Sequence, residues 1–262
     1  MVVWTKMHLF TIIPSFIVFM GIAVGLSRVL KNESEFLKWL PIKIIAIILM
    51  FTEIVKQVES VKQGYNYYHL PFHFCSLFVF LFPLFAFYRG RYKDQIRLVT
   101  TIACSMLFLF MLVVPSTIYS ESDITGFFKD YFSFHSVLFH NLVILGFFYI
   151  LAVQDHKFNT KKDCKVFMIV FSLYCSIGCI MSQVLRVNFN SFYTCQIPIF
   201  EKARLFAIEK IDWVGQLIYI ICLWIVILQY ALMCYWLYRG CVKLYKHIKN
   251  KAINNMNKKQ TN

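Results

Sequence analysis

Charged residues are scarce in this chain, and acidic ones are the scarcest. Asp, Glu, Lys and Arg together make up 15% of the 262 residues, and 13 acidic residues stand against 27 basic ones. A soluble domain carries about 25% charged and about 45–50% apolar residues. Here 59% of the residues are hydrophobic. This balance excludes an ordinary soluble domain and indicates a membrane protein.

Cysteine pairs of the kind that bind zinc are also missing. None of the nine cysteines belongs to a C-x-x-C pair, which argues against a structural zinc site. Five of them lie inside apolar runs, where a thiol behaves as a small hydrophobic group. Cys195 is the one cysteine expected in an exposed outer loop, and it has no obvious partner. We therefore expect neither a metal nor another cofactor.

The net charge of +14 raises the question of a nucleic-acid partner. The Lys and Arg residues, however, occur in short clusters between long apolar runs, as they do in the cytoplasmic loops of membrane proteins. Anionic lipid headgroups are the partner that this pattern indicates, and nucleic acid is not expected.

Seven apolar stretches are long enough to cross a bilayer, whose hydrocarbon core of about 30 Å needs about 20 helical residues. The first is longer than the apolar part of a cleavable signal peptide, so we interpret it as a span. We predict an all-α bundle of seven transmembrane helices in one domain, residues 1–238. A basic cytoplasmic tail, residues 239–262, is expected to fray or to lie on headgroups. The predicted spans are 8–30, 37–58, 69–88, 95–119, 131–153, 164–185 and 211–237.

The distribution of Lys and Arg predicts the orientation of this bundle. With the N-terminus outside, the inner loops and the tail hold 18 basic residues and the outer segments hold 8. Basic residues accumulate on the cytoplasmic side of membrane proteins. We therefore predict an N-out, C-in integral membrane protein.

Polar side chains within the predicted spans gather at the outer end. A charge at the centre of a span costs about 2.5–3.5 kcal/mol on insertion scales, so each needs a reason. Four of the seven histidines belong to this group. Their convergence from several spans predicts a polar cavity in the bundle core that opens outward. The group comprises Glu53, Gln57, His69, His73, Cys75, Ser133, His135, Ser136, His140, Asn141, Gln183, Arg186, Asp212 and Gln216.

Three chemistries could use this cavity. Its histidines and Glu53 could bind a metal, but His135 and His140 lie about 140° apart around a helix, which is weak evidence against a shared ion. Coupling of ions or protons in a transporter is a second use, although the sequence shows no sign of the broken spans and repeats of transporters. The third is nucleophilic catalysis by Cys75.

Catalysis by Cys75 requires a basic partner, because a thiol in apolar surroundings is inert unless a neighbour favours the thiolate. The nearest candidates by depth are His140 and His135. Pro71 is well placed to open a helix just before Cys75, where the helix dipole would favour an anion by about 0.3–1 kcal/mol. The plainer interpretation is that Cys75 is one more small core residue.

Three segments carry a resemblance to a known family. The string HLPFHFCS at residues 69–76, followed by LFVFLFP, resembles the signature of the YwaF family of bacterial integral membrane proteins. The strings FHSVLFHNLVI at 134–144 and NFNSFYTCQIP at 188–198 resemble two further segments of that family. YwaF proteins are similar to the animal transmembrane protein 164, a lipid acyltransferase.

The resemblance implies an enzyme of the bacterial cell membrane that moves a fatty acyl group between phospholipid and lysophospholipid. A Cys and a His from different spans carry that reaction, which implies Cys75 as nucleophile and His140 as base, with His135 open as the alternative base. The supporting residues would be His73, Glu53 and Asn141. The cavity would be lined by His69, Gln57, Gln183, Arg186 and Gln216. A transporter or small-ligand receptor that uses the same cavity is the rival hypothesis.

Overall fold

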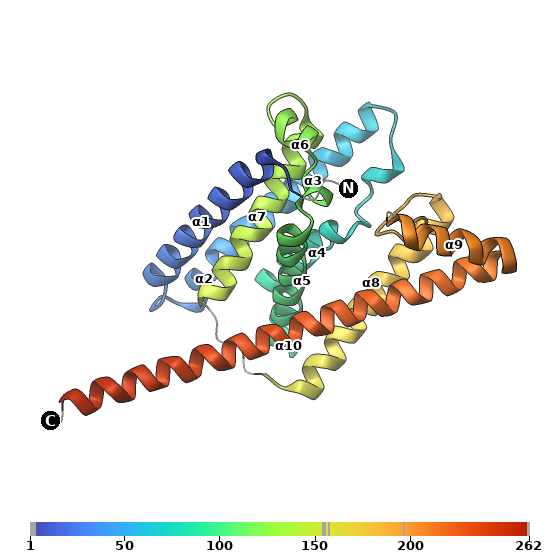
Figure 1. Cartoon of the computed structure of the whole chain (residues 1–262). Coiled ribbons are helices and arrows are strands. Elements are labelled where there is room, and N and C mark those ends of the chain that lie inside the picture. Colours follow the sequence, from blue (N-terminus) through green and yellow to red (C-terminus); the bar gives the residue numbers. More distant parts are fainter. Residues whose placement is uncertain (1–3, 154–155, 157, 196, 261–262) are drawn as a thin grey trace.

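The computed structural model describes residues 4–153, 156, 158–195 and 197–260, and within these residues every regular element is a helix (Figure 1). The elements are α1 (Lys6–Val29), α2 (Glu35–Lys38), α3 (Leu40–Lys62), η1 (Tyr67–His69), η2 (Phe74–Leu77), α4 (Phe78–Phe87), α5 (Lys93–Val113), η3 (Pro115–Thr117), α6 (Glu121–Gly126), α7 (Tyr131–Val153), α8 (Thr160–Leu185), α9 (Pro198–Ile211) and α10 (Trp213–Gln260).

Five of these helices are long and apolar enough to cross a membrane: α1, α5, α7, α8 and the Trp213–Ile248 part of α10. The predicted second span is formed as α3, which is long enough, with 23 residues, but too rich in charge to qualify. Lys43, Glu53, Lys56 and Glu59 all lie within it. The all-helical membrane class is therefore confirmed, whereas the count of seven spans and the N-out orientation stay predictions.

The prediction of one continuous helix over residues 69–88 is wrong. The chain makes the short η1, then runs extended at Leu70 (φ −60°, ψ 145°) and at His73 (φ −70°, ψ 153°) before η2 and α4 begin. Pro71 supplies the reason, because the residue before a proline is disfavoured in the helical conformation and proline has no N–H to donate. We call residues 70–77 the interrupted segment.

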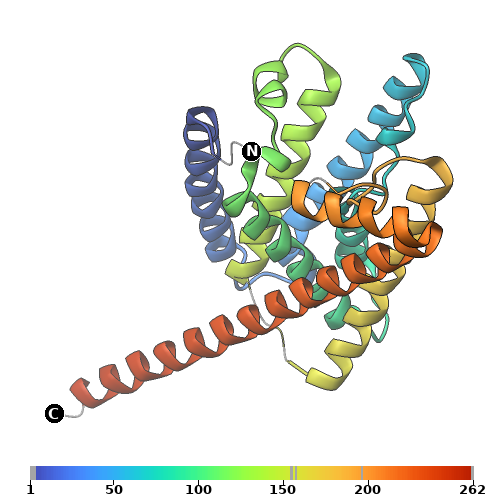
Figure 2. The same cartoon turned by 45° about the vertical axis from the view of Figure 1, so that its right-hand side comes forward.

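The C-terminal part contains more helix than the apolar stretches predict. The long connection after α8 contains α9, and residues 239–260 continue α10 as helix, whereas a position of this tail on headgroups stays a prediction. No proline or glycine occurs after Gly240, so nothing in the chain stops a helix that is already nucleated. This end of α10 extends away from the bundle in two views (Figures 1 and 2).

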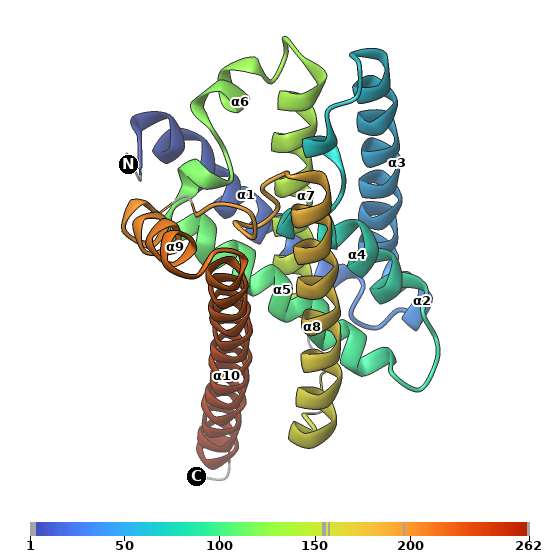
Figure 3. The same cartoon turned by 90° about the vertical axis from the view of Figure 1, so that its right-hand side faces the viewer.

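The core is aromatic and lies between α3, α4, α5 and α7. Helix α5 is the most buried of the five candidate spans and is central to the bundle (Figure 3). Phe78, Phe82 and Phe85 project from α4 at helical spacing and are all fully buried. Side chains of this size account for about 1.5–3 kcal/mol each when buried from water, and within a bilayer their close packing replaces that driving force.

Gly146 on α7 lies directly against the Phe82 ring of α4. A Cβ atom at this position would lie 2.5 Å from Cε1 of Phe82 and 3.5 Å from Cδ1 of Ile45. Phe82 is fully buried and cannot swing into open space. The absence of a side chain at Gly146 therefore leaves the space that the Phe82 ring occupies.

Replacing Gly146 with alanine should destabilise the protein by about 1–3 kcal/mol through overpacking, despite the gain in helix propensity. The midpoint of thermal unfolding of the detergent-solubilised protein measures the effect. Gly25→Ala in α1 is the control, because nothing lies within 4 Å of its added Cβ. Equal midpoints for the two variants would show that α4 and α7 are not in contact at Gly146.

Candidate functional site

The interrupted segment is held in place by one asparagine from the distant connection after α8. The Phe74 N–H donates to Oδ1 of Asn190 at 2.5 Å, and Nδ2 of Asn190 donates to the Phe72 carbonyl at 2.7 Å. The Tyr174 hydroxyl donates to the same carbonyl at 3.3 Å. Irregular backbone at membrane depth is tolerated where protein groups satisfy it, and Asn190 satisfies a donor and an acceptor at once.

Cys75 lies in the first turn of η2. Among the described residues, its N–H has no backbone carbonyl as a hydrogen-bond acceptor. The side chain is half-buried and packs on the aromatic core. A thiol whose own N–H is free combines a nucleophile with a donor for a developing oxyanion.

Asn190 lies on a tightly folded connection, residues 188–195, which we call the 188–195 loop. Asn190 and Ser191 both have positive φ, 53° and 66°. Phe189 and Phe192 on either side are fully buried. Oδ1 of Asn188 accepts from the N–H groups of the two residues after Phe192, at 3.2 and 3.1 Å.

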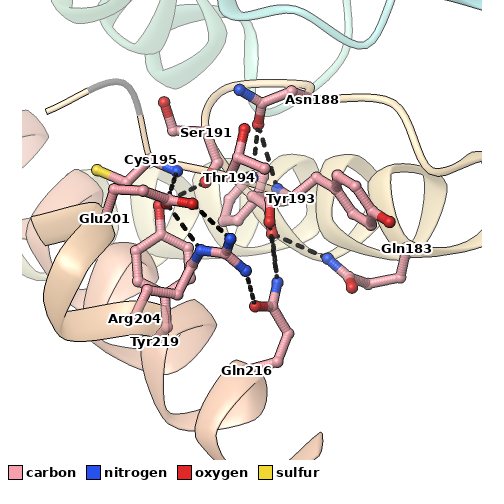
Figure 4. Close-up of polar contacts among 11 residues, drawn as sticks. Gln183, Asn188, Ser191, Tyr193, Thr194, Cys195, Glu201, Arg204, Gln216 and Tyr219 are labelled. Atoms are coloured by element: carbon pink, nitrogen blue, oxygen red, sulfur yellow. Dashed lines mark hydrogen bonds and ion pairs between the residues drawn. The ribbon is translucent and has the colours of Figure 1, made fainter. Parts of the chain in front are cut away.

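Polar side chains from α8, α9 and α10 surround this loop (Figure 4). Gln183 and Gln216 both donate to the Phe192 carbonyl, at 2.8 and 3.2 Å. The Tyr219 hydroxyl donates to the Ser191 carbonyl at 2.6 Å. The two glutamines predicted to line a cavity therefore hold the loop main chain. Arg186, predicted beside them, is exposed at the left-handed C-cap of α8, with φ 54°.

Helix α9 closes the same network through an ion pair. Glu201 accepts from Arg204 at 2.5 and 2.8 Å and from the Cys195 N–H at 2.6 Å, while Nη1 of Arg204 donates to Gln216 at 2.8 Å (Figure 4). The hydrogen bond from Arg204 holds the pKa of Glu201 below its usual value. The stabilisation from this group is therefore present above the ordinary carboxyl pKa and is lost as the pH falls through the lowered value.

His140 on α7 is held in one tautomer. Its Nδ1 lies 2.6 Å from the Ser136 carbonyl, which can only accept, so Nδ1 carries the proton. In the neutral ring the lone pair is then on Nε2, which is buried and has no partner among the described residues. An imidazole in this state can take a proton.

Tyr119 packs directly against His140. Its ring lies edge-on to the imidazole, with the ring centroids 5.4 Å apart. The Tyr119 hydroxyl donates to Oδ1 of Asn141 at 3.1 Å. Asn141 thus orients Tyr119. No hydrogen bond joins Cys75 to His140 within the described part of the chain, and their direct contact stays a prediction.

His135 belongs to a separate ion-paired cluster on α3 and α7. Its Nε2 lies 3.4 Å from Oε2 of Glu53, and the other Glu53 oxygen binds Lys56 at 2.7 Å and Gln57 at 2.8 Å. Gln57 also donates to the His69 carbonyl at 2.8 Å. Glu53 was expected to support the catalytic histidine. It contacts His135 instead of His140. The ring of His140 is oriented by the Ser136 carbonyl.

His69 and His73 have structural contacts. His73 bonds the Tyr68 carbonyl through Nε2 at 3.0 Å and packs against Phe189, while His69 bonds Oγ of Ser60 at 2.8 Å. Of these two, His135 and His140, it is His140 that combines a fixed tautomer with a buried ring nitrogen that has no partner among the described residues. Over the described ranges, no three His, Cys, Asp or Glu side chains lie where they could hold one metal ion.

The sequence did not identify three residues of this arrangement. Asn190 was quoted within a motif but given no role, and Tyr119 was taken as the last residue of an apolar stretch. Tyr174 lies inside an apolar run and gives no signal by itself. All three act on partners far away in the sequence, which a pattern of local spacing does not reveal.

Comparison with known proteins gives one match. A sequence model of the TMEM164 family matches residues 3–238, nearly the whole chain. No curated protein and no solved structure matches it. The family match agrees with the five apolar helices that are long enough to cross a membrane. The chain is therefore an integral membrane protein that belongs to the TMEM164 family.

Proposed function

We propose that this protein is a lipid acyltransferase in which Cys75 carries the acyl group and His140 moves the protons. The observation that carries the proposal is the state of His140, whose Nδ1–H is fixed on the Ser136 carbonyl and whose Nε2 is buried without a partner among the described residues. A base needs an available lone pair near the acidic proton.

The first half of the reaction forms a thioester. Nε2 of His140 takes the proton from the Cys75 thiol, and the sulfur attacks the ester carbonyl carbon of a membrane phospholipid. The Cys75 N–H stabilises the oxyanion of the tetrahedral intermediate. The ester C–O bond then breaks, His140 returns the proton to the leaving oxygen, and a lysophospholipid departs.

The second half runs the same steps in reverse with a different alcohol. The hydroxyl of an incoming lysophospholipid gives its proton to His140 and attacks the thioester carbonyl. The C–S bond breaks, and Cys75 recovers its proton from the imidazolium. Cys75 packs on the hydrophobic core, and the ring of the preceding Phe74 contacts those of Phe78 and Tyr174. Apolar surroundings of this kind keep water scarce and favour transfer over hydrolysis.

His140 is favoured over His135 as the base by what each ring already binds. Nε2 of His135 faces the Glu53 carboxylate. Nε2 of His140 has no partner among the described residues. The contact between His135 and Glu53 has a different role, because it joins α3 to α7.

A transporter is the second candidate, and one observation favours it. The third predicted span is interrupted, and ionisable groups, the buried Glu53 and His135 and the half-buried Lys56, lie beside the interruption. Interrupted spans with ionisable neighbours occur at the transport sites of membrane carriers. The assay below distinguishes the two candidates.

Cys75→Ala should abolish acyl transfer, and His140→Ala should lower its rate by about 10²–10⁴-fold, because proton transfer by a placed base contributes that much. The measurement is movement of a labelled fatty acyl chain from phospholipid to lysophospholipid in vesicles containing the full-length protein. Cys179→Ala, which changes a half-buried thiol on α8, is the control and should retain the rate. If Cys75→Ala still transferred the acyl chain, or if the native protein transferred none, the Cys75 mechanism would be wrong and the transporter would be the better hypothesis.

A thiol-reactive acyl probe tests the same pair without turnover. It should label Cys75 in the native protein, fail in Cys75→Ala, and label more slowly in His140→Ala because the thiolate forms less readily. Peptide mass spectrometry locates the adduct. Unchanged labelling in His140→Ala would reject His140 as the activating base.

Asn190→Ala should change the reactivity of the Cys75 thiol and the rate of acyl transfer in opposite directions. Losing both contacts of Asn190 frees the interrupted segment at a cost of about 1–3 kcal/mol, so Cys75 should react faster with a small alkylating agent while acyl transfer falls. Asn188→Ala is the control, since Asn188 binds only its own loop. If the two variants behave alike, Asn190 has no specific effect on Cys75 and acts only through the fold of the 188–195 loop.

A further inference from the structure

Helix α9 has an exposed face that nothing in the fold covers. Ile199, Phe200, Leu205 and Phe206 are each more than half exposed, although they lie on a well-formed helix. Soluble surfaces rarely carry such a patch without a partner. The helix is only 14 residues long, about 21 Å, which is too short for a bilayer core of about 30 Å.

Basic and apolar side chains alternate along the middle of this face. Ile199, Lys202, Phe206 and Lys210 follow one another at intervals of three or four residues and therefore form one stripe. All four are exposed, and Nζ of Lys210 lies 5.6 Å from the centre of the Phe206 ring. Lysine is depleted in protein–protein interfaces, so this stripe does not fit a contact with a second copy of the chain. It fits the boundary between acyl chains and phosphates, where lysine stems lie along apolar groups and the ammonium reaches outward.

The helix is firmly attached to a membrane-spanning element. At Gly215 on α10, an added Cβ would lie 2.4 Å from the carbonyl of Ala207 on α9, so the two backbones touch. A single residue, Asp212 with φ 49°, joins the two helices. The exposed surface of α9 continues onto Trp213, Leu217 and Ile218 of α10. Helix α9 is thus fixed beside a surface that faces lipid.

We propose that α9 lies in the phospholipid headgroup–acyl boundary, with Ile199 and Phe206 among the upper acyl carbons and Lys202 and Lys210 on lipid phosphates. Its opposite edge, through Glu201 and Arg204, holds the 188–195 loop. The assignment concerns binding to the lipid surface and does not depend on acyl transfer.

Photoactivatable phospholipids test the placement on the native, full-length protein in vesicles. One lipid carries its reactive group near the glycerol and the other near the end of the acyl chain. The shallow lipid should label peptides that contain residues 199–211, and the deep lipid should label the middle of α8 and α10 but not α9. Peptide mass spectrometry identifies the adducts.

A double variant supplies the matched comparison. Ile199→Asp with Phe206→Asp should reduce shallow labelling of α9 several-fold, because two carboxylates leave the acyl region, while deep labelling of α10 stays unchanged and reports an intact fold. Three outcomes would overturn the proposal: α9 unlabelled by both lipids, α9 labelled equally by the deep lipid, or α9 linked to a second copy of the chain.

Discussion

The arrangement of this protein depends on the double hydrogen bond between Asn190 and the main chain at Phe72 and Phe74. An interrupted helix inside a membrane bundle exposes amide and carbonyl groups that water cannot reach, and each unsatisfied group would cost several kcal/mol. One primary amide supplies an acceptor and a donor in the right places. With that requirement met, the chain can keep Cys75 on a turn with its own N–H free.

The contacts of Asn190 connect two parts of the sequence that looked like separate motifs. The string around Cys75 forms the interrupted segment, and the string around Asn190 supports it. Their distance in sequence, 116 residues between Phe74 and Asn190, explains why local patterns could suggest each one but not how they fit together.

Much of the fold followed from hydropathy, and α7 was predicted with the bounds that the structure gives it. Hydropathy failed to predict the secondary structure where tertiary contacts, and not apolar content, decide the conformation of the chain. Residues 69–77 are apolar enough for a helix, yet Pro71 and the contacts of Asn190 make an irregular chain more favourable. Helix α9 was missed because its apolar residues are mixed with lysines and never form a run. At the site, the clustering of the polar residues at one end of the spans stays a prediction. The pairing of His135 with Glu53 and of His140 with a backbone carbonyl depends on side-chain directions that spacing alone does not fix.

The unbroken course of α10 has a mechanical consequence. One helix of 48 residues begins at the turn after α9, contacts the 188–195 loop through Gln216 and Tyr219, and continues past the bundle to Gln260. Helices of fixed length respond to a thinner or thicker bilayer by changing their tilt. Because α9 touches α10 backbone to backbone at Gly215, any change in tilt of α10 also moves α9 and the loop that supports the interrupted segment. A change in the thickness of the surrounding lipid would therefore also change the geometry around the Cys75 thiol.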